Sequence, residues 1–223
     1  MPVRSDSDKT PPVRPVLARI GARVTAGATS VALRVGLFRL GSVACLFLLA
    51  ACGGARSPEA AHQKLCRAVA DGNASDLFQA LDQDSRWHWM TTQKANREGY
   101  DIILSNYPEG VERERQLRRF ERGATLGSGR ALFVEEVGRA ALPTLREVCV
   151  PGTRFEMAAD GASAVAVAPS GKRAPFRRGS RGGWGYAGFA DDADDRQKRA
   201  VADVEQVRVN AADFERAASR AAR

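Results

Sequence analysis

Hydrophobic positions between residues 57 and 150 recur every three or four residues, which is the spacing of amphipathic α-helices. The first helix is expected to begin at Ser57-Pro58-Glu59, because serine caps helices and proline fits their first turn. It ends near Gly72, and Asn73 caps the next helix. Pro143 is expected to kink or split the last helix of this part. The later helices are predicted over residues 84–107, 111–122 and 131–150.

From residue 153 the pattern changes to short apolar runs separated by turn residues, which is typical of antiparallel strands. Trp184, Tyr186 and Phe189 are expected on the buried face of the sheet. Residues 191–223 return to helical spacing, with acids at the start and arginine at the end, as the helix dipole favours. N-terminal helices, a small antiparallel β-meander and a long C-terminal helix predict an α+β fold. The strands are expected over residues 153–158, 163–168, 173–178 and 183–189.

An apolar run, Val43 to Leu49, precedes this domain, with Arg34 and Arg39 on its N-terminal side. A basic start, a short apolar run and small residues at its end are typical of a secretory signal. The run is shorter than the roughly 20 apolar residues that span a bilayer, so we favour a cleaved signal over an uncleaved membrane anchor. The polar, proline-rich residues before it are either a disordered leader or precede a true start near Val31 or Val35.

The residues that follow this run, Leu49-Ala50-Ala51-Cys52, resemble the lipobox of bacterial lipoprotein precursors. The resemblance implies that a diacylglycerol is attached to the Cys52 thiol and that the chain is cut just before Cys52. It divides the chain into a leader and signal segment (1–51), a flexible tether (52–57) and one periplasm-facing domain (58–223). Gly53 lacks the acid that retains lipoproteins at the inner membrane in enteric bacteria, so we expect the outer membrane.

The division also changes the net charge of the folded part and the set of cysteines that can pair within it. The formal net charge is +8, but residues 52–223 carry 27 basic and 24 acidic residues, a net of only +3. This balance does not favour a nucleic-acid-binding protein. Cys45 lies in the signal, which leaves Cys66 and Cys149 outside the cytoplasm, where a disulfide between them is expected. Two separate buried thiols are the alternative.

Residues 57–82, SPEAAHQKLCRAVADGNASDLFQALD, resemble the first helices of the cone-shaped fold of the nuclear transport factor 2 family. The resemblance implies a pocket, although the small sheet and the long last helix depart from the family. Trp87, Trp89 and Tyr100 are the candidate lining, with His88 as an acid, base or ligand. The alternative is a helix that packs its aromatic side chains into the core and leaves His88 exposed.

Three further patterns are weaker. His62 and Cys66 stand four residues apart and form half of a metal site, but no second half has ligand spacing, so no metal or cofactor is predicted. Residues 127–130 (Gly-Ser-Gly-Arg) precede a helix but lack the lysine of a phosphate-binding loop. A basic hairpin is either solvated or faces anionic lipid, lipopolysaccharide or cell-wall polymer. Its residues are Lys172, Arg173, Arg177, Arg178 and Arg181, around Phe176.

Two hypotheses follow for the function. The first is a non-catalytic accessory or binding lipoprotein, held to the bilayer through Cys52, with an anionic envelope polymer or a protein as partner. The second is a small-ligand-binding protein or enzyme with a cone-like pocket. A filled core favours the first, and a pocket into which a carboxylate or His88 points favours the second.

Overall fold

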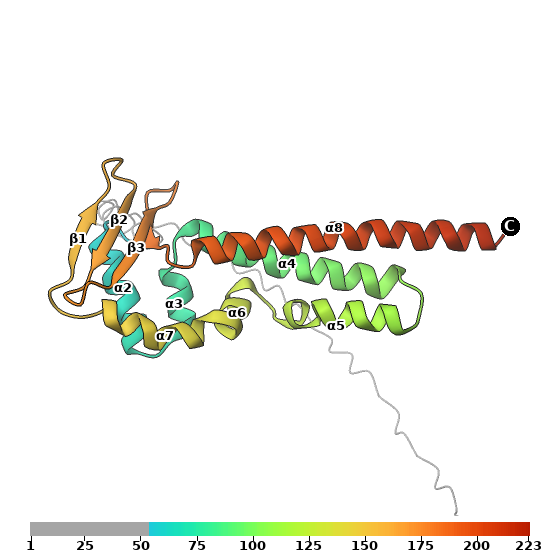
Figure 1. Ribbon diagram of the computed structural model, residues 1–223, viewed down its shortest axis with the longest axis horizontal. Helices are drawn as coiled ribbons and strands as arrows, with labels where there is room; N and C mark the ends of the chain where they lie inside the picture. The colour runs from blue at the N-terminus through green and yellow to red at the C-terminus, as the bar shows by residue number, and fades with distance from the viewer. Residues whose placement is uncertain (1–53) are drawn as a thin grey trace, which may run out of the picture. The chain divides into compact units, whose positions relative to one another are not determined.

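The computed structural model describes residues 54–223, which contain helices, a four-stranded antiparallel sheet and a long C-terminal helix (Figure 1). This is the predicted α+β class. The described residues belong to the second of two compact units, Leu46–Arg223. The leader, the apolar run, Cys45 and the lipobox with Cys52 lie outside the described residues.

The first two helices, α2 (Pro58–Ala70) and α3 (Ala74–Ala80), begin where the sequence predicts. The Ser57 hydroxyl accepts a hydrogen bond from the Ala60 N–H at 3.2 Å, which satisfies one free donor of the first turn. The Asn73 side chain does the same for Ser75 and Asp76, at 3.0 and 3.2 Å. Gly72 makes the connecting turn at a φ of +62°, which favours glycine.

Three long helices form a second apolar core away from the sheet. They are α4 (Gln83–Asn106), α5 (Val111–Thr125) and α8 (Ala190–Ala221), and α4 lies between the other two (Figure 1). Asp82 caps α4 by accepting hydrogen bonds from the backbone N–H groups of Asp84 and Ser85, at 3.0 and 3.1 Å. The apolar side chains buried between these helices include Ile103, Phe120, Val204 and Val207.

The predicted helix over 131–150 is not one regular helix, and Pro143 does not split it. It consists of α6 (Gly129–Phe133), a π-helical turn η1 (Val134–Gly138), α7 (Arg139–Leu145) and a 3₁₀ turn η2 (Arg146–Val148). Pro143 lies inside α7, whereas the irregular turns lie on either side of it. Gly138 permits close packing here, because a Cβ at this position would lie 2.9 Å from the Phe133 ring.

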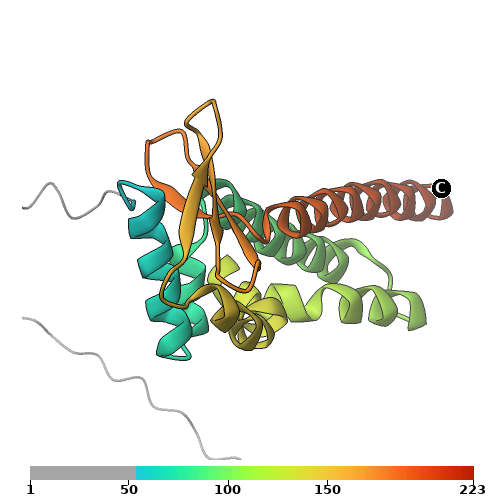
Figure 2. The same ribbon diagram turned by 60° about the vertical axis from the view of Figure 1, so that its left-hand side comes forward.

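The sheet is the predicted meander, with strands in the order β1-β2-β3-β4 and every neighbouring pair antiparallel. Helix α2 packs against β3 and β4 (Figure 2). The last strand ends earlier than expected, so Phe189 stands at the N-cap position of α8 instead of extending the sheet, and its ring centre lies 5.4 Å from that of Tyr186. The strands are β1 (Arg154–Met157), β2 (Ser163–Val167), β3 (Arg173–Arg178) and β4 (Trp184–Tyr186).

Part of the predicted flexible tether is bound to the sheet. Ala55 forms an antiparallel bridge with Trp184, and its carbonyl accepts a hydrogen bond from the Trp184 N–H at 2.8 Å. The two backbones approach closely because Gly54 and Gly183 face each other. A Cβ on Gly54 would lie 3.0 Å from the Cα of Gly183. The described chain therefore enters the fold along β4.

Candidate functional site

Two large apolar side chains are exposed near the start of α4. Trp87 is 55% exposed and Met90 is 49% exposed. They lie between two adjoining surface hollows of about 610 and 520 Å³, which share Phe78, Trp87, Met90 and Arg130 in their linings. We call the two hollows together the Trp87 groove. Exposed apolar side chains around a hollow are typical of a binding surface.

The first hollow runs along α4 as far as Lys94 and is closed on one side by residues 127–129. Gly129 sits directly on α4, because a Cβ there would lie 2.6 Å from the Cα of Met90. Ser128 caps α6 by accepting a hydrogen bond from the Ala131 N–H at 3.2 Å. The glycine-rich segment singled out in the sequence thus forms the wall of the hollow beside Trp87.

The second hollow runs from Trp87 toward β4 and is lined by Arg86, Arg181, Gly54 and Trp184. The Nε atom of Arg86 is buried, and it has no hydrogen-bond partner among the described residues. Burial lowers the pKa of Lys64 from its ordinary value, and the neighbouring Arg86 guanidinium lowers the pKa of Lys64 further. Arg86 and Arg181 therefore bring positive charge to this end of the groove.

The charged side chains that line the groove are all positive. Its lining contains four cationic residues and no carboxylate. Within residues 54–223, none of the four forms an ion pair, so no carboxylate of these residues neutralises their charge. The Arg130 guanidinium donates hydrogen bonds to the neutral side-chain oxygen of Gln79, the shorter at 2.7 Å. The four cationic residues are Arg86, Lys94, Arg130 and Arg181.

The predicted basic hairpin is divided by the fold. Lys172 pairs with Glu147 at 3.5 Å, and Arg173 pairs with Glu156 at 2.7 Å. Among the hairpin residues, Arg181 lines the groove. The hairpin is therefore partly neutralised, and its contribution to the candidate site is Arg181.

The predicted aromatic pocket is not formed. Successive residues of a helix point about 100° apart, so Trp87, His88 and Trp89 face three directions. Trp87 lines the groove, whereas Trp89 is 0% exposed and packs edge-to-face on Phe133 at 5.5 Å between ring centres. Tyr100 packs against the second core, between α4 and its neighbours. These side chains do not share a pocket.

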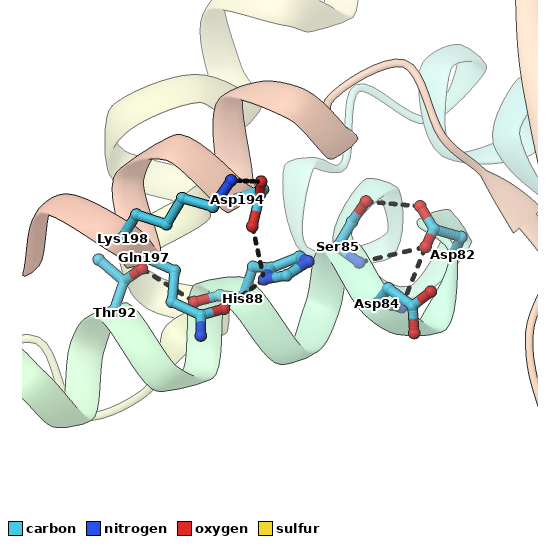
Figure 3. Close-up of polar contacts among 8 residues, drawn as sticks. All are labelled: Asp82, Asp84, Ser85, His88, Thr92, Asp194, Gln197 and Lys198. Atoms are coloured by element: carbon cyan, nitrogen blue, oxygen red, sulfur yellow. Dashed lines mark hydrogen bonds and ion pairs between the residues drawn. The ribbon is translucent and has the colours of Figure 1, made fainter. Parts of the chain in front are cut away.

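His88 faces α8 rather than the groove (Figure 3). Its Nδ1 lies 4.0 Å from a carboxylate oxygen of Asp194 and also contacts the Gln197 side chain. Lys198 lies 2.5 Å from the other oxygen of Asp194 and, by hydrogen bonding, lowers the pKa of that carboxyl. Sequence spacing misses this acid because it lies on another helix. The cluster links α4 to α8.

A hydroxyl lies one turn before His88, but it is used inside the helix cap (Figure 3). The Ser85 hydroxyl donates to the Asp82 carboxylate at 2.5 Å, and Ser85 is 0% exposed. A nucleophile needs a base within hydrogen-bond reach and access to the substrate. The buried Ser85 hydroxyl is thus engaged with Asp82, and its role in this structure is in the cap of α4.

The sulfur atoms of Cys66 and Cys149 lie 2.21 Å apart, at disulfide distance. Two separate thiols, which were the alternative, do not fit sulfur atoms that lie so close together. His62 Nε2 lies 3.4 Å from the Cys66 sulfur and donates to the Val148 carbonyl at 2.8 Å. The three side chains could also offer ligands to a metal. A metal would need both cysteines as free thiolates, so a metal site and the disulfide exclude each other.

No family model matches the chain, and no curated protein or solved structure matches it. The two resemblances, to the lipobox and to the nuclear transport factor 2 family, therefore rest on sequence patterns and stay predictions. Within residues 54–223, every helix is too short or too polar to cross a bilayer.

Proposed function

We propose that the protein is a lipoprotein of the cell envelope, anchored through Cys52, whose folded domain is a non-catalytic binding module. The anchor places the domain in the periplasm, and Gly53 after the cysteine favours the outer membrane. The lipobox at residues 49–52 is the basis for the anchor.

One structural observation carries the proposal. Gly54 and Ala55, two and three residues after Cys52, lie against β4, where Ala55 is hydrogen-bonded to Trp184. Two residues of extended chain span at most about 7 Å. A lipid on Cys52 would hold β4 and the adjoining groove close to the membrane surface, which suits a binding module for a partner in the envelope.

The filled core supports a non-catalytic role. Trp89, Phe133 and Phe176 occupy the space between the helices and the sheet, and all are fully buried. The groove is on the surface and its lining contains neither His88 nor a carboxylate. Its chemistry is that of binding through cations and apolar contacts, since general acid–base catalysis needs a group that exchanges a proton near neutral pH.

The cysteine pair supports the location. A disulfide between Cys66 and Cys149 would persist in an oxidising compartment such as the periplasm, whereas cytosolic thiols are kept reduced. It would join α2 to the end of the helical segment before β1, across 83 residues of chain.

The anchor is tested by labelling cells that express the full chain with a fatty-acid analogue. We expect label in the parent and none in Cys52→Ala. Cys45→Ala is the matched control, because it removes the other cysteine of the same segment, and it should be labelled like the parent. Equal label in Cys52→Ala and the parent contradicts the proposal.

A further inference from the structure

The Trp87 groove combines exposed apolar side chains with cationic ones. Trp87 and Met90 expose apolar area, and four cations without ion-pair partners among residues 54–223 surround them. The buried Arg86 Nε has no hydrogen-bond acceptor among the same residues. Arg86 lines the second hollow, so a ligand that places an anionic oxygen in this hollow would gain a charge-assisted hydrogen bond from its guanidinium.

We propose that the Trp87 groove binds anionic phospholipid of the bilayer that holds Cys52, with Arg86, Arg130 and Arg181 on the lipid phosphate and Trp87 and Met90 on the apolar part. This inference rests on the proposed function for the identity of the bilayer. It adds a second, non-covalent membrane contact to the anchor.

The position of the groove favours a lipid of the membrane over a soluble anion. Gly54 lines the groove and lies two residues after Cys52, so the attached lipid would begin within about 7 Å of the groove edge. A ligand in the same bilayer is thereby held at high effective concentration. Because so few residues separate Cys52 from the groove, the anchored domain could not turn the groove far from the membrane.

The composition of the groove favours an amphiphile over a polyanion. A polyanion is recognised by cations and gains little from exposed Trp87 and Met90. Tryptophan is enriched at membrane interfaces, where its ring meets both the apolar chains and the polar headgroups, and basic residues add attraction to anionic lipid.

The test uses the full chain with Cys52→Ala, so that no covalent lipid contributes, and measures co-flotation with vesicles. One set of vesicles is phosphatidylcholine alone, and the other is phosphatidylcholine and phosphatidylglycerol in equal parts. We expect stronger partitioning to the second set. The double change Arg130→Gln and Arg181→Gln should weaken it by about 25-fold, at about fivefold for each cation.

Matched controls separate the groove from general charge. Arg220→Gln with Arg223→Gln removes two exposed arginines at the far end of α8 and should leave partitioning within about twofold of the parent. Arg130→Lys with Arg181→Lys keeps the charge and should retain binding. Trp87→Ala should weaken binding, whereas Val201→Ala, at another exposed apolar position, should not.

Equal loss in the groove variant and the α8 control overturns the inference. Groove-dependent binding of inorganic polyphosphate without vesicle binding also overturns it and assigns the groove to a soluble polyanion. The result is independent of the anchor: vesicle binding with no fatty-acid label on the parent contradicts only the proposed function. Label on Cys52 without groove-dependent vesicle binding contradicts only this inference.

Discussion

The Ala55 carbonyl accepts a hydrogen bond from the Trp184 N–H at 2.8 Å, which fixes the entry of the described chain to the edge of β4. The bridge depends on a pair of facing glycines. A Cβ on Gly183 would lie 2.9 Å from the Cα of Gly54, closer than such contacts normally come. The proposed distance between the anchor and the groove depends on this contact.

Gly183→Ala is therefore expected to release residues 54–57 from β4. Loss of one backbone hydrogen bond should lower the free energy of unfolding by only about 1 kcal/mol. The sharper measurement is hydrogen exchange, in which the Trp184 amide should lose protection. Gly127→Ala is the control, because its Cβ would meet nothing within 4 Å. Unchanged protection of Trp184 in Gly183→Ala would show that the bridge does not depend on the glycine pair.

The cysteine pair gives a second prediction. Cys66→Ser with Cys149→Ser should lower the free energy of unfolding by about 2–4 kcal/mol, because the cross-link restricts the unfolded chain. Reduction of the parent should give a similar loss, and Cys45→Ser should give none. Urea titration measures the effect. Peptide mapping without reductant that finds Cys66 and Cys149 as free thiols contradicts the pairing.

The two tryptophans of α4 should respond in opposite ways. Trp89→Ala opens a cavity in the core and is expected to cost about 3–5 kcal/mol of unfolding free energy. Trp87→Ala removes an exposed side chain and should change it by less than about 0.5 kcal/mol. Urea unfolding of both variants checks this, and similar costs at the two positions would contradict the assignment of Trp87 to the surface.

Tyr186 gives a prediction for alkaline pH. Burial raises the pKa of its hydroxyl above the ordinary value of 10.0. The unfolded chain therefore ionises first, and the free energy of unfolding should fall as pH rises above about 10. Below that pH this contribution is fully present. Tyr186→Phe should show a shallower fall between about pH 9 and 11, and an identical pH dependence in both proteins would contradict this role of Tyr186.

Local features were the predictable part of the fold. Ser57 and Asn73 mark helix starts because a cap acts within three residues of chain, and the strand limits follow turn residues next to them. The apolar spacing before Pro143 predicts a regular helix and does not distinguish it from the π-helical turn found at Val134–Gly138. The sequence pattern extends the sheet to Phe189 because apolar alternation continues after the strand itself ends.

The candidate site was only partly predictable. Trp87, residues 127–130 and Arg181 were each singled out, but for three different sites. The fold joins them because α4, the loop before α6 and the turn before β4 meet around Trp87. Asp194 was missed for the same reason, since only tertiary packing brings it to His88. Spacing along the chain cannot report contacts between separate elements.

The intact mass of the protein extracted from membranes of cells that express the full chain tests the central claim most directly. We predict a chain that begins at Cys52 and carries the added mass of a diacylglycerol, and a Cys52→Ala protein that lacks this mass. A membrane-extracted parent that retains residues before Cys52, or that begins at Cys52 without an added lipid, would contradict the account.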